Sequence, residues 1–461
     1  MMDNAVNGNL SIRTFHIHDH LGYSPEMVHN RRLLYWERDL KGNSVNDEYI
    51  ATTAGSKGEG FSSPTESDID VLYTFKHILC MNNAGVSDDK NDTIFQMENE
   101  KCHPGHFELK FHQQSNDDTK NIPNLHKAMV KQEKDSTYIS SELFRKLISE
   151  STNKVMHQDF SAENLAGPAI PHSKGLVRLE RVFAFRCPHP QAILTNWIKR
   201  VRPYNWPPAW LIEEVAKQEA QLVPVGCKGS KNNAMEWRIC FIPGELLLTK
   251  SLNETQYKLY IVLKQVNKSQ LKPICQEMSS YIMKNIVYWI VETNPRDIFY
   301  PENILLLLVS CLTMLLQSVK ENCLRYYMIP DRNLLKDRIT DEEQVKLINK
   351  IQELIAEGPA LVLRVERLKT ALETAEDELV AKGHRKDRLE ILDLVRGNIE
   401  AKHCRPDLSH KEEHALVRGD PEYKSVLERM CDLVLTEWRQ CPEEDREEIL
   451  HRKVEQALAC N

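Results

Sequence analysis

The stretch that decides the fold is Gly55-Ser56-Lys57-Gly58-Glu59-Gly60-Phe61-Ser62-Ser63-Pro64-Thr65-Glu66-Ser67-Asp68-Ile69-Asp70-Val71-Leu72. Its last part alternates polar and apolar residues, which predicts a β-strand with one face in the core. On such a strand Asp68 and Asp70 project from the same face, while Ile69 and Val71 enter the core. Neighbouring carboxylates repel each other unless a cation neutralises them, and hard oxygen ligands favour Mg²⁺ or Mn²⁺.

The glycines and the serine before this strand predict a phosphate-binding turn. At Gly55 the backbone can approach a phosphate closely, and the Ser56 hydroxyl can donate a hydrogen bond to a phosphate oxygen. Gly-Ser and Asp-x-Asp are each common, so the argument depends on their order and spacing. The alternative interpretation is an exposed acidic turn after a flexible loop.

Composition places the chain among globular proteins. Its 461 residues predict two or three domains, and 41% hydrophobic with 28% charged residues excludes collagen-like, low-complexity and wholly disordered classes. A net charge of −7 supplies no general attraction to nucleic acid or to an anionic membrane, so any polyanion site must be a local patch. The longest apolar run, 304–316, is shorter than the ~20 residues that span a bilayer and predicts a buried helix.

Targeting signals and cysteine usage point to the inside of the cell. The N-terminus lacks the apolar stretch of a secretory signal. Twelve cysteines are scattered without a CxxC pair, which is typical of reduced thiols. We expect a cytoplasmic location, with the nucleus as the alternative, and no membrane partner.

Helix and strand patterns alternate in the first half of the chain. Ser24 as N-cap and Pro25 at the first helical position begin a long helix that continues to about Lys41. Strands are expected at 107–111 and at 176–186, where polar and apolar residues alternate.

Beyond about residue 250 the pattern becomes almost purely helical, near 255–265, 274–292, 303–320 and 340–356. Thr340 and Glu343 form a capping-box signature. A further apolar repeat at spacings of four and three predicts a helical tail that packs on itself or on the body; a self-associating coil is the alternative. This repeat consists of Leu361, Val365, Leu368, Leu372, Ala375 and Leu379.

These patterns predict an α+β fold followed by helices. The expected divisions are an N-terminal segment with a long helix (1–45), a core with polar insertions (46–250), a helical lobe (251–340) and a helical C-terminal extension (341–461).

The motifs resemble the nucleotidyltransferase signature of the cyclic GMP-AMP synthase-like receptors and the wider male-abnormal-21 (Mab-21-like) family. Asp68 follows Ser56 by twelve residues, as in that signature, and further blocks in the same order extend the resemblance over about 20–340. These blocks include Arg31-Arg32, Glu100-Lys101-Cys102-His103-Pro104-Gly105, Gly167-Pro168-Ala169, Arg186-Cys187-Pro188, Trp206-Pro207, Glu236-Trp237-Arg238, Ser280-Tyr281-Ile282-Met283-Lys284 and Tyr327-Met328-Ile329-Pro330.

The resemblance implies a bilobal enzyme, with a mixed twisted sheet that carries the acids and a helical lobe that closes a nucleotide cleft. The family chemistry joins ATP and GTP into a cyclic dinucleotide second messenger of innate immunity, with two Mg²⁺ or Mn²⁺ ions. The extension after residue 340 lies outside the resemblance.

The resemblance also implies a third metal-binding carboxylate beside Asp68 and Asp70. The family usually has aspartate there, and this chain has Glu180. Glutamate keeps the charge but is one methylene longer, and a misplacement of about an ångström can cost roughly a hundredfold in rate. The sequence therefore leaves open an active enzyme and a weakened or silent one.

The resemblance also implies which residues bind the nucleotides. Gly55 and Ser56 would hold a phosphate, as would Lys264, whose helix register is ambiguous. In the helical lobe Ser280 precedes Tyr281, which would stack on a base, and Arg238 would contact a base edge; ordinary packing between the lobes is the alternative for these two.

The resemblance suggests double-stranded nucleic acid as the activator. Arg31, Arg38 and Lys41 would lie near one face of the long helix, although a solvated charged face is the alternative. The interval 243–279 contains one cysteine, Cys275, and no histidine, so we expect no structural zinc loop there. Because the resemblance links such a loop to DNA sensing, we favour RNA over DNA as the activator. The competing class is a catalytically silent Mab-21-like protein, a nucleotide-binding or interaction scaffold with a protein partner on its C-terminal helices.

Two histidine groups offer weaker metal hypotheses. His16, His18 and His20 would share one face if that segment were a strand, and a second group is His403, Cys404, His410 and His414. Ordinary terminal and loop residues are the alternative for both.

Overall fold

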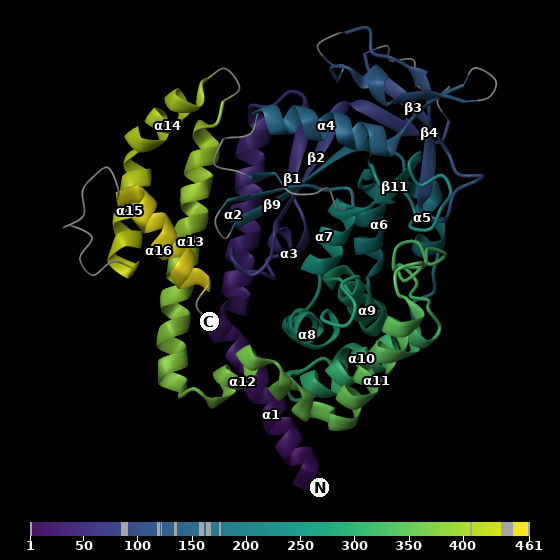
Figure 1. The fold of residues 1–461 in the computed structure, drawn as a ribbon. Coiled ribbons are helices and arrows are strands. Elements are labelled where there is room, and N and C mark those ends of the chain that lie inside the picture. Colours follow the sequence, from purple (N-terminus) through teal and green to yellow (C-terminus); the bar gives the residue numbers. More distant parts are fainter. Residues whose placement is uncertain are drawn as a thin grey trace.

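The computed structural model describes residues 2–83, 91–117, 120, 122–132, 136–155, 161–162, 167–174, 177–405, 408–434 and 446–459. It confirms the α+β class: a mixed sheet packs against a helical lobe, and further helices follow at the C-terminus (Figure 1). The polar segments around 84–90 and 118–135 lie wholly or partly outside the described residues.

Among the described residues, the sheet has eleven strands in the order β1-β2-β3-β4-β11-β10-β9-β8-β7, with β6 beside β4 and β5 beside β6. β2 also pairs with β9, so the path through β3, β4, β11 and β10 returns to β2. β2 is parallel to β3 and β9, and the other pairs are antiparallel. The strands are β1 (Tyr49–Thr53), β2 (Ile69–Met81), β3 (Thr93–Glu98), β4 (His106–Gln113), β5 (Met129–Lys131), β6 (Thr137–Ile139), β7 (Ser161–Ala162), β8 (Ile170–Lys174), β9 (Val177–Cys187), β10 (Ala220–Val223) and β11 (Glu236–Cys240).

The three strands expected from alternation are present as β2, β4 and β9. The two faces of β9 lie in different environments. Phe185 packs in the main core, where its ring stacks on Phe95 and Trp237 with centroids 5.6 and 4.6 Å apart. Glu180 and Val182 project from the opposite face, toward the helical lobe. One face of β9 therefore packs in the core, and the other face lines a cleft.

Aromatic packing against the sheet is completed by α4 (Ser141–Val155), whose Phe144 contacts Phe185. Short helices connect the strands: α3 (Gly55–Gly58), α5 (Gln191–Ile198) and α6 (Ala209–Lys217).

The helical lobe contains α7 (Ile242–Lys250), α8 (Glu254–Val266), α9 (Ser280–Thr293), α10 (Ile304–Lys320) and α11 (Asp341–Glu357). Three of the four helices expected here have nearly the predicted bounds, and Thr340 with Glu343 forms the predicted capping box. The exception is α9, which begins at Ser280 rather than near 274, because Pro273 and the turns around it interrupt the helical pattern.

The apolar helix α10 is buried, as predicted. By length and composition alone, residues 301–320 are the one described segment that could cross a membrane. However, Leu305, Leu308 and Leu312 are fully buried in the core, where α10 packs against α8, α9 and α11.

The N-terminus is helical, so the strand proposed for His16, His18 and His20 is wrong. α1 (Met2–His18) leads through a π-helical turn, Asp19–Tyr23, to α2 (Pro25–Ser44). Burial recurs at Ser11, Thr14, Phe15, Ile17 and His18, which is a helical and not a strand period. His16 is exposed while His18 is buried, so these histidines do not share a face.

The burial of His18 predicts a pH-dependent stability. Its Nδ1 lies 2.6 Å from the Thr14 carbonyl, and burial lowers the pKa of His18 from 6.5 to about 4. Between these values the unfolded chain binds a proton that the folded protein excludes. The free energy of unfolding should therefore fall as the pH drops from about 6.5 to 4, by up to about 1.4 kcal/mol per unit. His18→Gln should remove this part of the slope, measured by urea unfolding at pH 7 and 5; identical slopes in both proteins would refute it.

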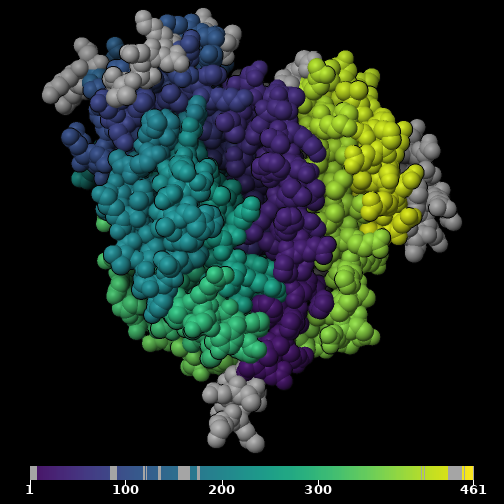
Figure 2. All heavy atoms as spheres, turned by 180° about the vertical axis from the view of Figure 1, so that it is seen from behind, coloured from purple at the N-terminus to yellow at the C-terminus, as the bar shows by residue number. Residues whose placement is uncertain are grey.

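The C-terminal region consists of α12 (Glu366–Glu373), α13 (Glu376–His403), α14 (His410–Gly419), α15 (Pro421–Val434) and α16 (Arg446–Ala459). α13 packs along α2 (Figure 1), and from behind the N-terminal helices form a strip between the body and these helices (Figure 2). The C-terminal helices also share a small core of their own, which includes Leu392, Tyr423 and Met430. The tail thus packs both on itself and on the body.

The packing of α13 changes the interpretation of the basic residues on α2. Arg31 is fully buried, and its Nε and Nη2 donate to the carboxylate of Glu390 on α13 at 2.5 and 2.8 Å. Arg38 donates to Thr53, and Lys41 remains half-exposed. The expected basic face is therefore not a continuous free surface, because α13 covers the part that carries Arg31.

At the second histidine group, the described side chains form no cluster that could hold a metal ion. His403 Nε2 lies 2.8 Å from Asp420 Oδ2, and Cys404 is exposed. The side chain of His410 lies outside the described residues. The ten described cysteines are all free thiols.

Candidate active site

A cavity of about 830 Å³ lies between the sheet and the helical lobe. It is built from both lobes, with walls from α3, β2, β9 and β11 on one side and from α8 and α9 on the other. All the site residues predicted from the sequence line it: Gly55, Ser56, Asp68, Asp70, Glu180, Arg238, Lys264, Ser280 and Tyr281.

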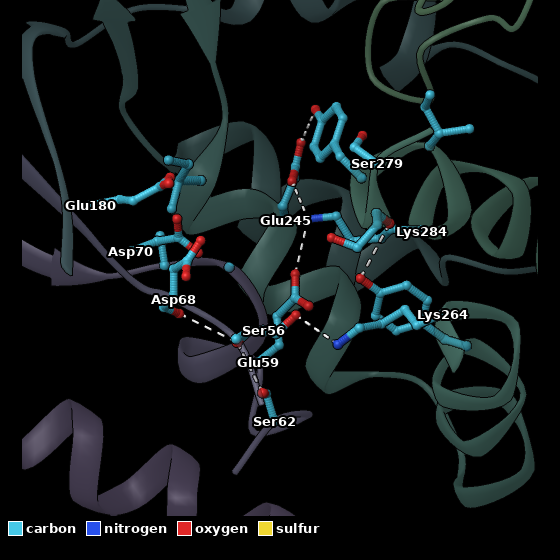
Figure 3. A pocket seen from close by; sticks show the side chains of 18 of the residues that line it. Ser56, Glu59, Ser62, Asp68, Asp70, Glu180, Glu245, Lys264, Ser279 and Lys284 are labelled. Carbon is cyan, nitrogen blue, oxygen red and sulfur yellow. Dashed lines mark hydrogen bonds and ion pairs between the residues drawn. The ribbon is translucent and has the colours of Figure 1, made fainter. Parts of the chain in front are cut away.

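Three acids gather at the sheet side of this cavity (Figure 3). The parallel register of β2 and β9 sets Asp70 directly opposite Glu180, and Asp68 stands two residues before Asp70. Burial, together with the negative charges of Glu180 and Asp68, raises the pKa of Asp70 from 3.8 to about 7. The three carboxylates are therefore close enough to oppose each other's ionisation.

An arginine that sequence analysis missed contacts two of these acids. Arg178 Nη1 lies 3.7 Å from Asp68 Oδ2, and Nη2 lies 3.7 Å from Glu180 Oε1. Arg178 precedes Glu180 by two residues on β9, so strand alternation alone places both on one face. The guanidinium partly compensates the acidic cluster.

The donor set fits a divalent cation in its chemistry. Asp68, Asp70 and Glu180 offer hard carboxylate oxygens, and one guanidinium does not balance three negative charges. As the side chains stand, the described residues contain no group of three His, Cys, Asp or Glu arranged to hold a metal ion. A metal ion would compete with the Arg178 guanidinium for Asp68 and Glu180.

The turn before β2 packs tightly against the acids. Gly55 has φ +57°, and a Cβ at this position would lie 2.2 Å from Asp70 Oδ2, so only glycine fits. Lys264 Nζ, from α8, donates to Ser56 Oγ at 2.8 Å and to the Phe61 carbonyl at 3.3 Å. The structure thus resolves the register of α8: Lys264 enters the cleft beside the Gly-Ser turn.

A buried network fixes Tyr281. Its hydroxyl donates to Glu245 Oε1 at 2.8 Å, and Lys284 bridges Glu245 and Glu59 at 2.6 and 2.9 Å (Figure 3). Sequence analysis assigned no role to Glu59, Glu245 or Lys284. Only Lys284 had a signal, because it follows Tyr281 by three residues and so shares its helix face.

The fold and the site define a class of protein: a bilobal, nucleotidyltransferase-like α+β protein with an acidic cluster in the cleft between its lobes. Residues 255–353 match the family model of the Mab-21 protein HhH/H2TH-like domain. This match supports membership of the chain in the Mab-21 family, which is nucleotidyltransferase-like, and a cyclic GMP-AMP synthase-like architecture is consistent with it.

The matched residues contain the helical wall of the cleft, including Lys264, Ser280 and Tyr281, whereas the three acids precede them. No curated protein matches the sequence.

Proposed function

We propose that this protein is a metal-dependent nucleotidyltransferase that joins ATP and GTP into a cyclic dinucleotide. The observation that carries the proposal is the placement of Asp68, Asp70 and Glu180 in one cleft, with Lys264 bonded to Ser56 beside them. The cavity, at about 830 Å³, has the size of typical small-molecule sites.

The residues that line the cleft would have separate roles in the reaction. Divalent ions held by Asp68, Asp70 and Glu180 would activate a sugar hydroxyl and stabilise charge on the transferred phosphoryl group. Ser56 and Lys264 would donate hydrogen bonds to phosphate oxygens. Tyr281, whose hydroxyl is fixed by Glu245, would present a rigid face on which a base stacks.

We also propose double-stranded RNA as the activator, in innate immune signalling in the cytoplasm. The interval 243–279 contains a single cysteine and no histidine, too few ligands for a zinc loop, and by the family resemblance this favours RNA over DNA. With Arg31 paired to Glu390, the duplex would contact the basic residues of α2 that α13 leaves uncovered.

One observation favours a second candidate function. Arg178 contacts Asp68 and Glu180, and a guanidinium held there would take the place of a metal ion. The alternative is therefore a catalytically silent Mab-21-like scaffold, with a cleft that binds nucleotide and C-terminal helices that recruit a protein partner.

A product assay tests the proposal. The full chain is incubated with ATP, GTP and Mg²⁺ or Mn²⁺, with and without duplex RNA or DNA, and products are identified by mass spectrometry. We expect a cyclic dinucleotide that disappears in the Asp68→Asn, Asp70→Asn double variant. No product under any of these conditions would contradict the synthase proposal. The Glu180→Asp variant then separates the two candidate functions. Activity that appears only in this variant indicates a weakened enzyme, whereas no activity in either the wild type or the variant favours the scaffold.

A further inference from the structure

Two arginines meet at the end of the cavity near Tyr281. Arg238 comes from β11, and Arg332 from the turns that follow α10; both line the cavity. Arg332 is only 8% exposed. The Arg332 side chain packs beside β11: its Cδ lies 3.2 Å from the position of a Cβ at Gly105, whose carbonyl accepts the N–H of Ile239, the residue after Arg238. Burial and the Arg238 charge lower the pKa of Arg332.

Neither guanidinium has an acidic partner within the described residues. Arg238 Nε is buried without any hydrogen-bond partner. The Arg332 guanidinium lies over the ring of Tyr326, 5.1 Å from its centroid, and forms no side-chain hydrogen bond or ion pair within the described residues. A buried charge without a partner is costly, so an arrangement of this kind points to a ligand that completes it.

The nearest carboxylate already accepts hydrogen bonds from other donors. The Glu245 carboxylate already accepts hydrogen bonds from Tyr281 and Tyr326, each at 2.8 Å, and from Lys284. His106 stands opposite Arg238 in the β4–β11 pair, and burial with the charges of Arg332 and Arg238 lowers the pKa of His106 to about 3. A neutral His106 whose Nδ1 faces the Pro104 carbonyl offers one acceptor nitrogen at most, so donors outnumber acceptors at this end of the cleft.

We propose that Arg332 is a specificity-determining residue that, together with Arg238, binds the acceptor edge of a guanine base stacked on Tyr281. Guanine presents two acceptors, O6 and N7, on one edge, and a guanidinium can donate to both. Adenine presents the N6 amino donor beside N7, and that donor would face the arginine donors. The inference rests on the proposed nucleotide-binding function and deepens it by naming the preferred base.

Binding measurements test the proposal without depending on turnover. The probes are the α,β-methylene analogues of GTP and ATP, with 7-deaza-GTP, which lacks the N7 acceptor, titrated by calorimetry in Mg²⁺. Arg332→Met removes the donors and keeps an unbranched side chain. The matched control is Arg338→Met, because Arg338 lines the same cavity but is paired with Glu277 at 2.6 Å.

We expect the wild type to bind the GTP analogue at least about tenfold more tightly than the ATP analogue, since a good base-edge contact discriminates by roughly 5- to 150-fold. 7-deaza-GTP should lose part of this preference. Arg332→Met should weaken the GTP analogue about tenfold and leave the ATP analogue within about twofold, while Arg338→Met preserves the ratio. Thermal unfolding without nucleotide checks that each variant is folded, and Arg332→Lys, which keeps the charge with fewer donors, should be intermediate.

An unchanged GTP-to-ATP ratio in Arg332→Met overturns the inference, as does an equal loss of both analogues, which would indicate a contact with phosphate. If the wild type binds neither analogue, both the inference and the proposed function fail. GTP-selective binding without any cyclic product would support the inference and contradict the synthase proposal alone.

Discussion

Asp70→Asn should abolish nucleotide transfer, by about a thousandfold or more, and at the same time stabilise the metal-free protein. The loss follows because Asp70 stands at the centre of the acidic cluster, opposite Glu180. The gain follows because burial and the charges of Glu180 and Asp68 oppose its ionisation and raise its pKa to about 7. Asparagine has the shape of aspartate, so it fits against Gly55 without adding charge.

The sign of the pH dependence makes this prediction specific. The folded wild type keeps a proton on Asp70 between pH 4 and 7 that the unfolded chain has released, so wild-type stability should fall as the pH rises through this window. Asparagine at position 70 does not titrate, so the stability of the variant should not fall for this reason. We expect it to be more stable than the wild type by about 1–3 kcal/mol at pH 8 and by little at pH 4.5.

Urea unfolding in the presence of EDTA at both pH values, together with the product assay, measures the two effects. Asp297→Asn is the control, since Asp297 is exposed and lies outside the cleft. A variant that retains activity would remove Asp70 from the catalytic site. A variant that is less stable at pH 8 would refute the electrostatic argument.

Glu390→Ala should weaken the attachment of α13 to α2 by about 3–5 kcal/mol. Glu390 and Arg31 form a bidentate ion pair with two hydrogen bonds, and both side chains are 1% exposed. Removal of the carboxylate would leave the guanidinium of Arg31 buried, with the Gly60 carbonyl as its remaining acceptor. Hydrogen exchange of the α13 amides should accelerate by more than a hundredfold, because local opening then costs less free energy.

Two matched variants separate a buried ion pair from general damage to α13. The double variant Arg31→Met, Glu390→Leu should recover most of the lost protection, because no unpaired charge remains. Glu378→Ala, which removes an exposed pair with Lys382 on the same helix, should change protection by less than about 1 kcal/mol. If Glu390→Ala behaves like Glu378→Ala, the pair does not hold α13 in place.

Local patterns of the sequence predicted the elements of the sheet and of the helical lobe. Alternation identified β2, β4 and β9, and the start of α2 at Ser24 and Pro25 is confirmed by the Ser24 side chain, which accepts the Met27 N–H. Such patterns succeed because the faces of a strand or helix are set by residues two to four apart. Such patterns fail at α1, where the two-residue spacing of histidines suggests a strand although the burial period is helical.

The sequence alone thus determined which residue types share a face: Asp68 with Asp70 on one strand, and Glu180 with Arg178 on another. Only the tertiary structure decided which faces meet. The parallel register of β2 and β9 brings Asp70 to Glu180, α8 brings Lys264 to Ser56, and α13 buries Arg31. Arg31 and Glu390 are 359 positions apart, and no local period encodes such a pairing. Contacts across the fold depend on the packing of whole elements, which buries some charges as pairs and leaves others, such as Arg332, facing the cleft.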